Sequence, residues 1–132
     1  MRGPRIVLAD DHQEMLELVA RLIEGKFDIV ATVETGQCAI EAVTKLNPDL
    51  VVLDISMPIL DGFETVRRLR ASGSRVTVVF LTLLEDRDLV AAAISIGVLG
   101  YVLKPYLITD LIPAIQCALQ GELFCSPPLR PK

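Results

Sequence analysis

Runs of aliphatic residues alternate along the chain with segments of mixed character, and this alternation predicts strands separated by helices. The clearest run is 50–53, four consecutive large aliphatic residues that end on Asp54. Because these residues do not alternate with polar ones, the run favours a parallel strand covered on both faces over a half-exposed antiparallel strand. Four further strands are predicted at 5–9, 27–33, 75–81 and 100–103.

Between these runs, apolar residues recur at helical spacing and predict five helices, which begin near residues 12, 39, 61, 85 and 109. The last helix is predicted to be capped by Thr109 or Asp110, which puts Pro113 near its first turn, and to end at Gly121. The element order is then five consecutive β-α units. With right-handed crossovers, such units form an α/β fold in which a parallel sheet carries helices on both faces.

Composition and charge narrow the class of protein. The length of 132 residues suits one domain, predicted at 1–121, and the three prolines of 122–132 favour a linker or tail. The net charge of −4, without clustered Lys and Arg, argues against direct nucleic-acid binding. Three widely spaced cysteines and one histidine argue against a zinc site or a disulfide framework. We find no signal peptide and no run that could span a membrane, so a soluble, cytoplasmic protein is expected.

Polar residues follow four of the predicted strands: Asp10-Asp11, Asp54, Thr82 and Lys104. The carboxyl ends of parallel strands meet at one edge of a sheet, where open α/β sheets bind their ligands. Carboxylates crowded together repel one another unless protons or a cation compensate, and Mg²⁺ favours such oxygen ligands. Asp54 is therefore a candidate nucleophile towards phosphorus, with Lys104 and the Thr82 hydroxyl binding the phosphoryl oxygens.

Each of these residues also has a simpler interpretation. A helix cap explains Asp10 or Asp11 alone, a hydroxyl at a strand end explains Thr82, and a solvated cation explains Lys104. The chemical interpretation is favoured because all of them fall at the same edge of the predicted sheet.

The same ordered set resembles the receiver domain of response regulators. It comprises the Asp10-Asp11 pair, Asp54 with Met57-Pro58 and Asp61-Gly62 after it, Thr82, and the segment 100–105. The resemblance covers residues 5–121 and implies a flavodoxin-like (βα)5 fold, a doubly wound five-stranded parallel sheet with strand order 2-1-3-4-5. It also implies bound Mg²⁺, with ligands from Asp10 (mainly through water), Asp11, Asp54 and the backbone carbonyl of Ser56.

By this resemblance, Asp54 accepts a phosphoryl group from a sensor histidine kinase. Thr82 and Tyr101 are the implied switch residues, coupling phosphorylation to the surface of the fourth helix, fifth strand and fifth helix, and to homodimer formation. The Lys104-Pro105 bond is expected to be cis. Segment 121–127 resembles the linker of LuxR-type transcription regulators, although no helix-turn-helix domain follows within the 132 residues.

Two other functions compete with the phosphoacceptor switch. A phosphatase of the haloacid dehalogenase type needs a second Asp two residues after its nucleophile, and Ser56 stands there. No enzymatic activity beyond self-phosphorylation and self-dephosphorylation is therefore expected. A pseudo-receiver that acts only as a protein-interaction module remains an alternative, because Leu83 stands where the family usually has Ala or Gly, and Val98 where a small residue is common.

Overall fold

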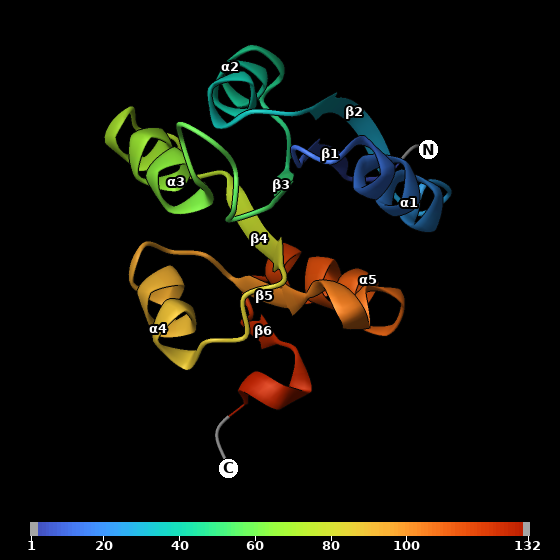
Figure 1. Ribbon diagram of the computed structural model, residues 1–132. Coiled ribbons are helices and arrows are strands. Elements are labelled where there is room, and N and C mark those ends of the chain that lie inside the picture. Colours follow the sequence, from blue (N-terminus) through green and yellow to red (C-terminus); the bar gives the residue numbers. More distant parts are fainter. Residues whose placement is uncertain (1–2, 131–132) are drawn as a thin grey trace.

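One parallel sheet of six strands runs through the protein, and helices cover both of its faces (Figure 1). The computed structural model describes residues 3–130. The strand order is β2-β1-β3-β4-β5-β6, so the predicted α/β fold and the order 2-1-3-4-5 are confirmed, with a short sixth strand added. The strands are β1 (Arg5–Ala9), β2 (Asp28–Val33), β3 (Leu50–Leu53), β4 (Thr77–Thr82), β5 (Gly100–Leu103) and β6 (Phe124–Cys125). The helices are α1 (Gln13–Ile23), α2 (Gly36–Leu46), α3 (Gly62–Ala71), α4 (Arg87–Ser95) and α5 (Leu107–Leu119).

Strand β3 lies in the middle of the protein, and all four of its residues are buried, as the aliphatic run predicted. Its side chains alternate between two separate apolar clusters. Val51 and Leu53 belong to the cluster under α2, α3 and α4. Leu50 and Val52 belong to the cluster under α1 and α5. Burial on both faces therefore explains why this strand has no polar position before Asp54.

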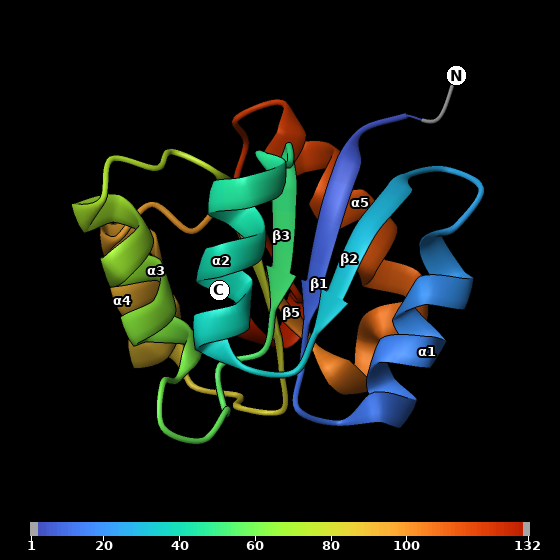
Figure 2. The ribbon, with the colours of Figure 1, turned by 90° about the horizontal axis from the view of Figure 1, so that it is seen from above.

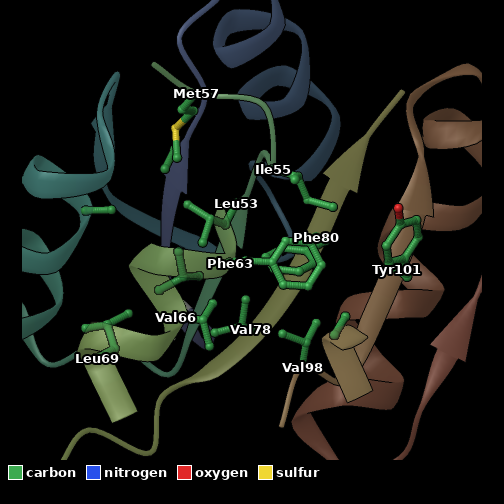
Figure 3. Close-up of a cluster of buried hydrophobic side chains, with 14 of the residues drawn as sticks. Leu53, Ile55, Met57, Phe63, Val66, Leu69, Val78, Phe80, Val98 and Tyr101 are labelled. Atoms are coloured by element: carbon green, nitrogen blue, oxygen red, sulfur yellow. The ribbon is translucent and has the colours of Figure 1, made fainter. Parts of the chain in front are cut away.

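Aromatic side chains connect α3, β4 and β5 within the first cluster (Figure 3). The rings of Phe63 and Phe80 pack edge to face with centroids 5.1 Å apart, and Phe80 packs on Tyr101 at 6.3 Å. Val98 is also buried in this cluster. The three rings thus form a row that runs from α3 across β4 to Tyr101 on β5.

The register of the sheet brings the strand ends to a common edge. Ala9 pairs with Leu53 across β1 and β3, and Thr82 pairs with Leu103 across β4 and β5. The residues that follow β1, β3 and β5 therefore leave the sheet at the same edge, with β4 between β3 and β5. Figure 2 shows the loops that follow these strands gathered at one end of the molecule, opposite the N-terminus.

Three expectations about the C-terminal third were wrong. Helix α5 begins at Leu107, and Pro113 is its seventh residue rather than part of its first turn. The Lys104–Pro105 peptide bond is trans. Residues Lys104–Tyr106 form a 3-10 helix that runs directly into α5, because the fixed backbone angle of a proline suits the first residues of a helix. No separate cap is then needed, and Thr109 donates its hydroxyl hydrogen to the Tyr106 carbonyl.

The sixth strand falls in the segment for which a linker or tail was expected. Phe124 and Cys125 pair in parallel with Gly100 and Tyr101 of β5, and the 3-10 helix Pro127–Leu129 follows. Among the helices of residues 3–130, none has the length and apolar character needed to cross a bilayer.

Candidate functional site

A buried ion-pair cluster lies at the carboxyl edge of the sheet. The Lys104 ammonium is 2.9 Å from Asp10 Oδ2 and 3.2 Å from Asp54 Oδ2. Asp54 is 3% exposed and Lys104 8%, so both charges are shielded from solvent. The three side chains come from the ends of β1, β3 and β5, as their positions in the sequence predicted. A single lysine thus bridges two carboxylates that are far apart in sequence.

One ammonium does not fully compensate two buried carboxylates. Burial raises the pKa of the Asp54 carboxyl, the Lys104 charge opposes this shift, and the Asp10 charge adds to it. For Lys104, burial alone would lower the pKa, but its bond to Asp10 and the charge of Asp54 outweigh burial, and the pKa is raised. The lysine is therefore held in its charged form, while its one positive charge is shared between the carboxylates of Asp10 and Asp54.

Asp11 and His12 extend this cluster towards solvent. Asp11 Oδ1 is buried and has no hydrogen-bond partner among the described residues; His12 Nδ1 lies 3.1 Å away but is not aligned for a hydrogen bond. The backbone N–H of His12 donates to Asp10 Oδ1 at 2.9 Å. Ligand atoms of Asp10, Asp11, His12 and Asp54 all lie within 4.8 Å of one another.

This donor set fits a divalent cation. The buried, unpartnered oxygen of Asp11 needs a positive partner, and a carboxylate-rich cluster suits Mg²⁺. His12 was not predicted as part of the cluster, although its position directly after two acids was a signal. Ser56 lies in the same loop as Asp54, and its backbone N–H donates to Asp54 Oδ1 at 3.3 Å.

The two predicted switch residues, Thr82 and Tyr101, both contact Leu84. The Thr82 hydroxyl accepts a hydrogen bond from the Leu84 N–H at 3.3 Å, and the Tyr101 hydroxyl donates to the Leu84 carbonyl at 2.7 Å. Both side chains are 1% exposed. Burial, with smaller contributions from the charges of Asp86 and Cys125, raises the pKa of Tyr101 to about 12. The loop between β4 and α4 is therefore held from both β4 and β5.

Leu83 stands at the mouth of the site. It is 70% exposed and lines an open cleft of about 530 Å³ that also reaches Asp11 and Lys104. The other lining residues are His12, Gln13, Glu14 and Met15. Leu83 is therefore an apolar side chain in the wall of a cleft that reaches Asp11 and Lys104.

Asp61 and Gly62 have structural roles beneath the site. The Asp61 side chain caps α3 by accepting a hydrogen bond from the Glu64 N–H at 2.9 Å. A Cβ atom on Gly62 would lie 2.7 Å from the Asp54 carbonyl oxygen and 2.8 Å from Ile55 Cα. Glycine is needed here because the start of α3 packs directly on the backbone of the central acid.

The sequence matches the family model of the response regulator receiver domain over residues 6–116. The chain belongs to the response regulator receiver family. This receiver is 37% identical over 125 residues to the transcriptional regulatory protein DegU of Brevibacillus brevis, an alignment that covers 93% of this chain and 53% of that protein. It is 37% identical over 116 residues to the transcriptional regulatory protein PdtaR of Mycobacterium tuberculosis, covering 87% of this chain and 56% of that protein. The receiver thus spans about half the length of these relatives.

Solved receivers have the same fold. A LuxR-family two-component response regulator from Aurantimonas sp. SI85-9A1 superposes with a TM-score of 0.91 at 29% identity, covering 96% of this chain and 92% of that chain. The receiver domain of the putative response regulator NarL from Mycobacterium tuberculosis superposes with a TM-score of 0.85 at 26% identity, covering 92% and 100%.

Receiver domains are the regulatory parts of two-component response regulators, many of which control transcription. They bind Mg²⁺ at their acidic pocket, interact with histidine kinases and are mostly not enzymes. One relative, 39% identical over 109 residues, is a protein-glutamate methylesterase/protein-glutamine glutaminase from Nocardioides, of which this receiver covers 30%. The family model and these relatives confirm the prediction of a response-regulator receiver domain.

Proposed function

We propose that this receiver is a phosphoacceptor switch in which Asp54 takes a phosphoryl group from a phosphohistidine of a sensor histidine kinase. The observation that supports this most directly is the buried cluster in which Lys104 contacts both Asp10 and Asp54 beside the unpartnered oxygen of Asp11. An Asp54 oxygen attacks phosphorus, the bond from phosphorus to the histidine nitrogen breaks, and the imidazole leaves with the electron pair.

The other residues bind the charges that develop during transfer. The Lys104 ammonium neutralises one phosphoryl oxygen, and the Thr82 hydroxyl donates a hydrogen bond to another. Asp10, Asp11, Asp54 and the Ser56 backbone carbonyl are the proposed Mg²⁺ ligands. When bound, Mg²⁺ supplies positive charge to the phosphoryl oxygens.

The proposed output follows from the contacts of Leu84. If the Thr82 hydroxyl turns to a phosphoryl oxygen, it gives up the Leu84 N–H, while Tyr101 keeps the Leu84 carbonyl. The loop before α4 then moves, and the surface formed by α4, β5 and α5 changes. We expect this surface to promote self-association, as part of a transcription regulator of the LuxR type.

The decisive experiment is labelling with acetyl phosphate and Mg²⁺, read by intact mass. Wild type gains one phosphoryl group, Asp54→Asn gains none, and Asp49→Asn behaves as wild type. Asp49 is the matched control, because it is an exposed acid directly before β3, at the opposite end of the strand that leads to Asp54. Labelling of Asp54→Asn at the wild-type level would show that another residue is the acceptor.

The same experiment discriminates against a pseudo-receiver. Such a module takes no phosphoryl group and does not bind beryllium fluoride in the presence of Mg²⁺. Phosphatase activity on added phosphomonoesters is not expected, because Ser56 lacks the carboxyl group that would protonate a leaving group.

A further inference from the structure

Ser126 is a fully buried polar residue outside the phosphoacceptor cluster. It follows β6 directly and is 0% exposed. A buried hydroxyl is costly unless its hydrogen-bonding groups are paired, so its partners indicate what it contributes.

The Ser126 hydroxyl connects three segments of the chain. It donates to Asp110 Oδ2 in α5 at 2.8 Å and accepts from the backbone N–H of Leu103 in β5 at 3.0 Å. Asp110 is itself buried, and its other oxygen lies 3.0 Å from the Thr109 hydroxyl, which shares its one hydrogen between this carboxylate and the Tyr106 carbonyl. The Leu103 N–H lies just beyond the two residues of β5 that pair with β6, so the hydroxyl takes the place of the next backbone acceptor.

These bonds fix the end of the strand that carries Lys104. Leu103 is the last residue of β5, and Lys104 follows it into the ion-pair cluster with Asp10 and Asp54. The backbone N–H of Ser126 also donates to the carbonyl of Tyr101, whose hydroxyl binds the loop before α4. Ser126 therefore contacts both the residue before the lysine and the predicted switch tyrosine.

The rest of the segment 124–130 packs on the same region. Leu129 is buried in the apolar cluster under α4, and Arg130 donates to the Cys125 carbonyl at 2.9 Å. Arg87 at the start of α4 donates to the Arg130 carbonyl at 3.3 Å. The segment thus touches α4, β5 and α5, the elements that the proposed switch moves.

We propose that Ser126 is a positioning residue for Lys104, and that docking of residues 124–130 is coupled to occupancy of Asp54. This inference rests on the proposed phosphoacceptor function. Without the hydroxyl, the Leu103 N–H and the Asp110 carboxylate lose a partner, and the end of β5 no longer holds Lys104 at Asp54. By thermodynamic linkage, a phosphoryl group on Asp54 then strengthens docking by the same factor as docking strengthens phosphoryl binding.

The test compares the beryllium fluoride affinity of wild type, Ser126→Ala and Ser72→Ala at fixed Mg²⁺, followed by NMR. Ser72 is the control, because it is an exposed serine whose hydroxyl makes one short bond, to the Leu69 carbonyl at 2.8 Å at the end of α3, away from β5 and β6. We expect Ser126→Ala to weaken binding by about fivefold or more, and Ser72→Ala to leave it unchanged.

Hydrogen exchange separates positioning from a purely structural role. In wild type, beryllium fluoride should slow exchange of the Phe124 and Ser126 amides, which bond to the Leu99 and Tyr101 carbonyls. If Ser126 only stabilised the fold, Ser126→Ala would bind beryllium fluoride as tightly as wild type, and beryllium fluoride would slow exchange of these amides equally in both proteins. If Ser126→Ala does not fold, Arg130→Ala removes the bond from the guanidinium to the Cys125 carbonyl, which holds the segment in its docked conformation, and should weaken binding in the same direction.

The outcomes are distinct. If wild type does not bind beryllium fluoride, the phosphoacceptor function itself fails. If wild type binds and the folded Ser126→Ala protein, or Arg130→Ala in its place, binds equally well, the coupling is refuted.

Discussion

Replacing Lys104 with methionine should destabilise the metal-free protein strongly and make its stability depend on Mg²⁺. The substitution keeps a long apolar side chain in a site that is 8% exposed but removes the one ammonium that, within residues 3–130, contacts Asp10 and Asp54. Both carboxylates are buried, and even with the lysine present the pKa of Asp54 is raised by its burial.

The magnitude follows from the cost of an unpaired buried charge. Breaking a buried ion pair by removing one partner costs about 3 kcal/mol of unfolding free energy, at the low end of the usual range because a carboxyl can take up a proton. With a urea slope of about 1.5 kcal/mol per molar, this loss lowers the unfolding midpoint by about 2 M. Mg²⁺ at about one hundred times its dissociation constant would restore roughly 2.7 kcal/mol.

The assay is urea unfolding followed by far-UV circular dichroism, in EDTA and in saturating Mg²⁺. Lys45→Met is the matched control, because Lys45 is an exposed lysine in the last turn of α2 and its loss should change stability by about 0.5 kcal/mol or less. If Lys104→Met and Lys45→Met unfold at the same urea concentration in EDTA, the buried carboxylates are not what the lysine compensates.

Three further predictions concern single residues of the site. Asp11→Ala should raise the unfolding free energy in EDTA by up to about 1 kcal/mol and weaken Mg²⁺ binding, because it relieves repulsion among carboxylates; a loss of stability in the same titration would mean that Asp11 is mainly structural. Leu83→Ala should speed labelling by acetyl phosphate with little change in stability, because the side chain is 70% exposed at the cleft; an unchanged rate would show that Leu83 does not restrict access. Burial raises the pKa of Tyr101 to about 12, so its tyrosinate absorbance should appear near that pH and be missing in Tyr101→Phe. An unfolded tyrosine ionises near pH 10, so the stability that the neutral phenol contributes is present below about pH 10 and is lost as the pH rises towards 12, and Tyr101→Phe should flatten this part of the profile.

The sequence predicted the parts of the fold that depend on local pattern. Strand β3 and the acid that follows it were predicted correctly because burial on both faces leaves an uninterrupted aliphatic run. The meeting of Asp10, Asp54 and Lys104 followed from their positions at the ends of parallel strands. These inferences needed only the periodicity of side chains and the geometry of a parallel sheet.

The parts that were missed depend on contacts between distant segments. Strand β6 is two residues long and lies among prolines, so nothing local distinguishes it from a linker. Its partners on β5 and the acceptor of the Ser126 hydroxyl, Asp110, are 16 to 24 residues away in sequence. The wrong cap for α5 has a local cause instead, because the 3-10 helix Lys104–Tyr106 runs into α5 before Thr109 and Asp110 are reached.

The short strand β6 also determines how far a fragment of this protein must extend at its C-terminal end if the edge of β5 is to stay covered. Phe124 and Cys125 cover part of the outer edge of β5, and the Ser126 hydroxyl pairs the next free N–H. A fragment that stopped at Gly121 would present Gly100–Leu103, an apolar strand with unsatisfied backbone groups, as an open edge of the sheet. Such edges pair with other chains, so the shorter fragment should aggregate, whereas one that extends through Arg130 should stay monodisperse during purification in the unphosphorylated state.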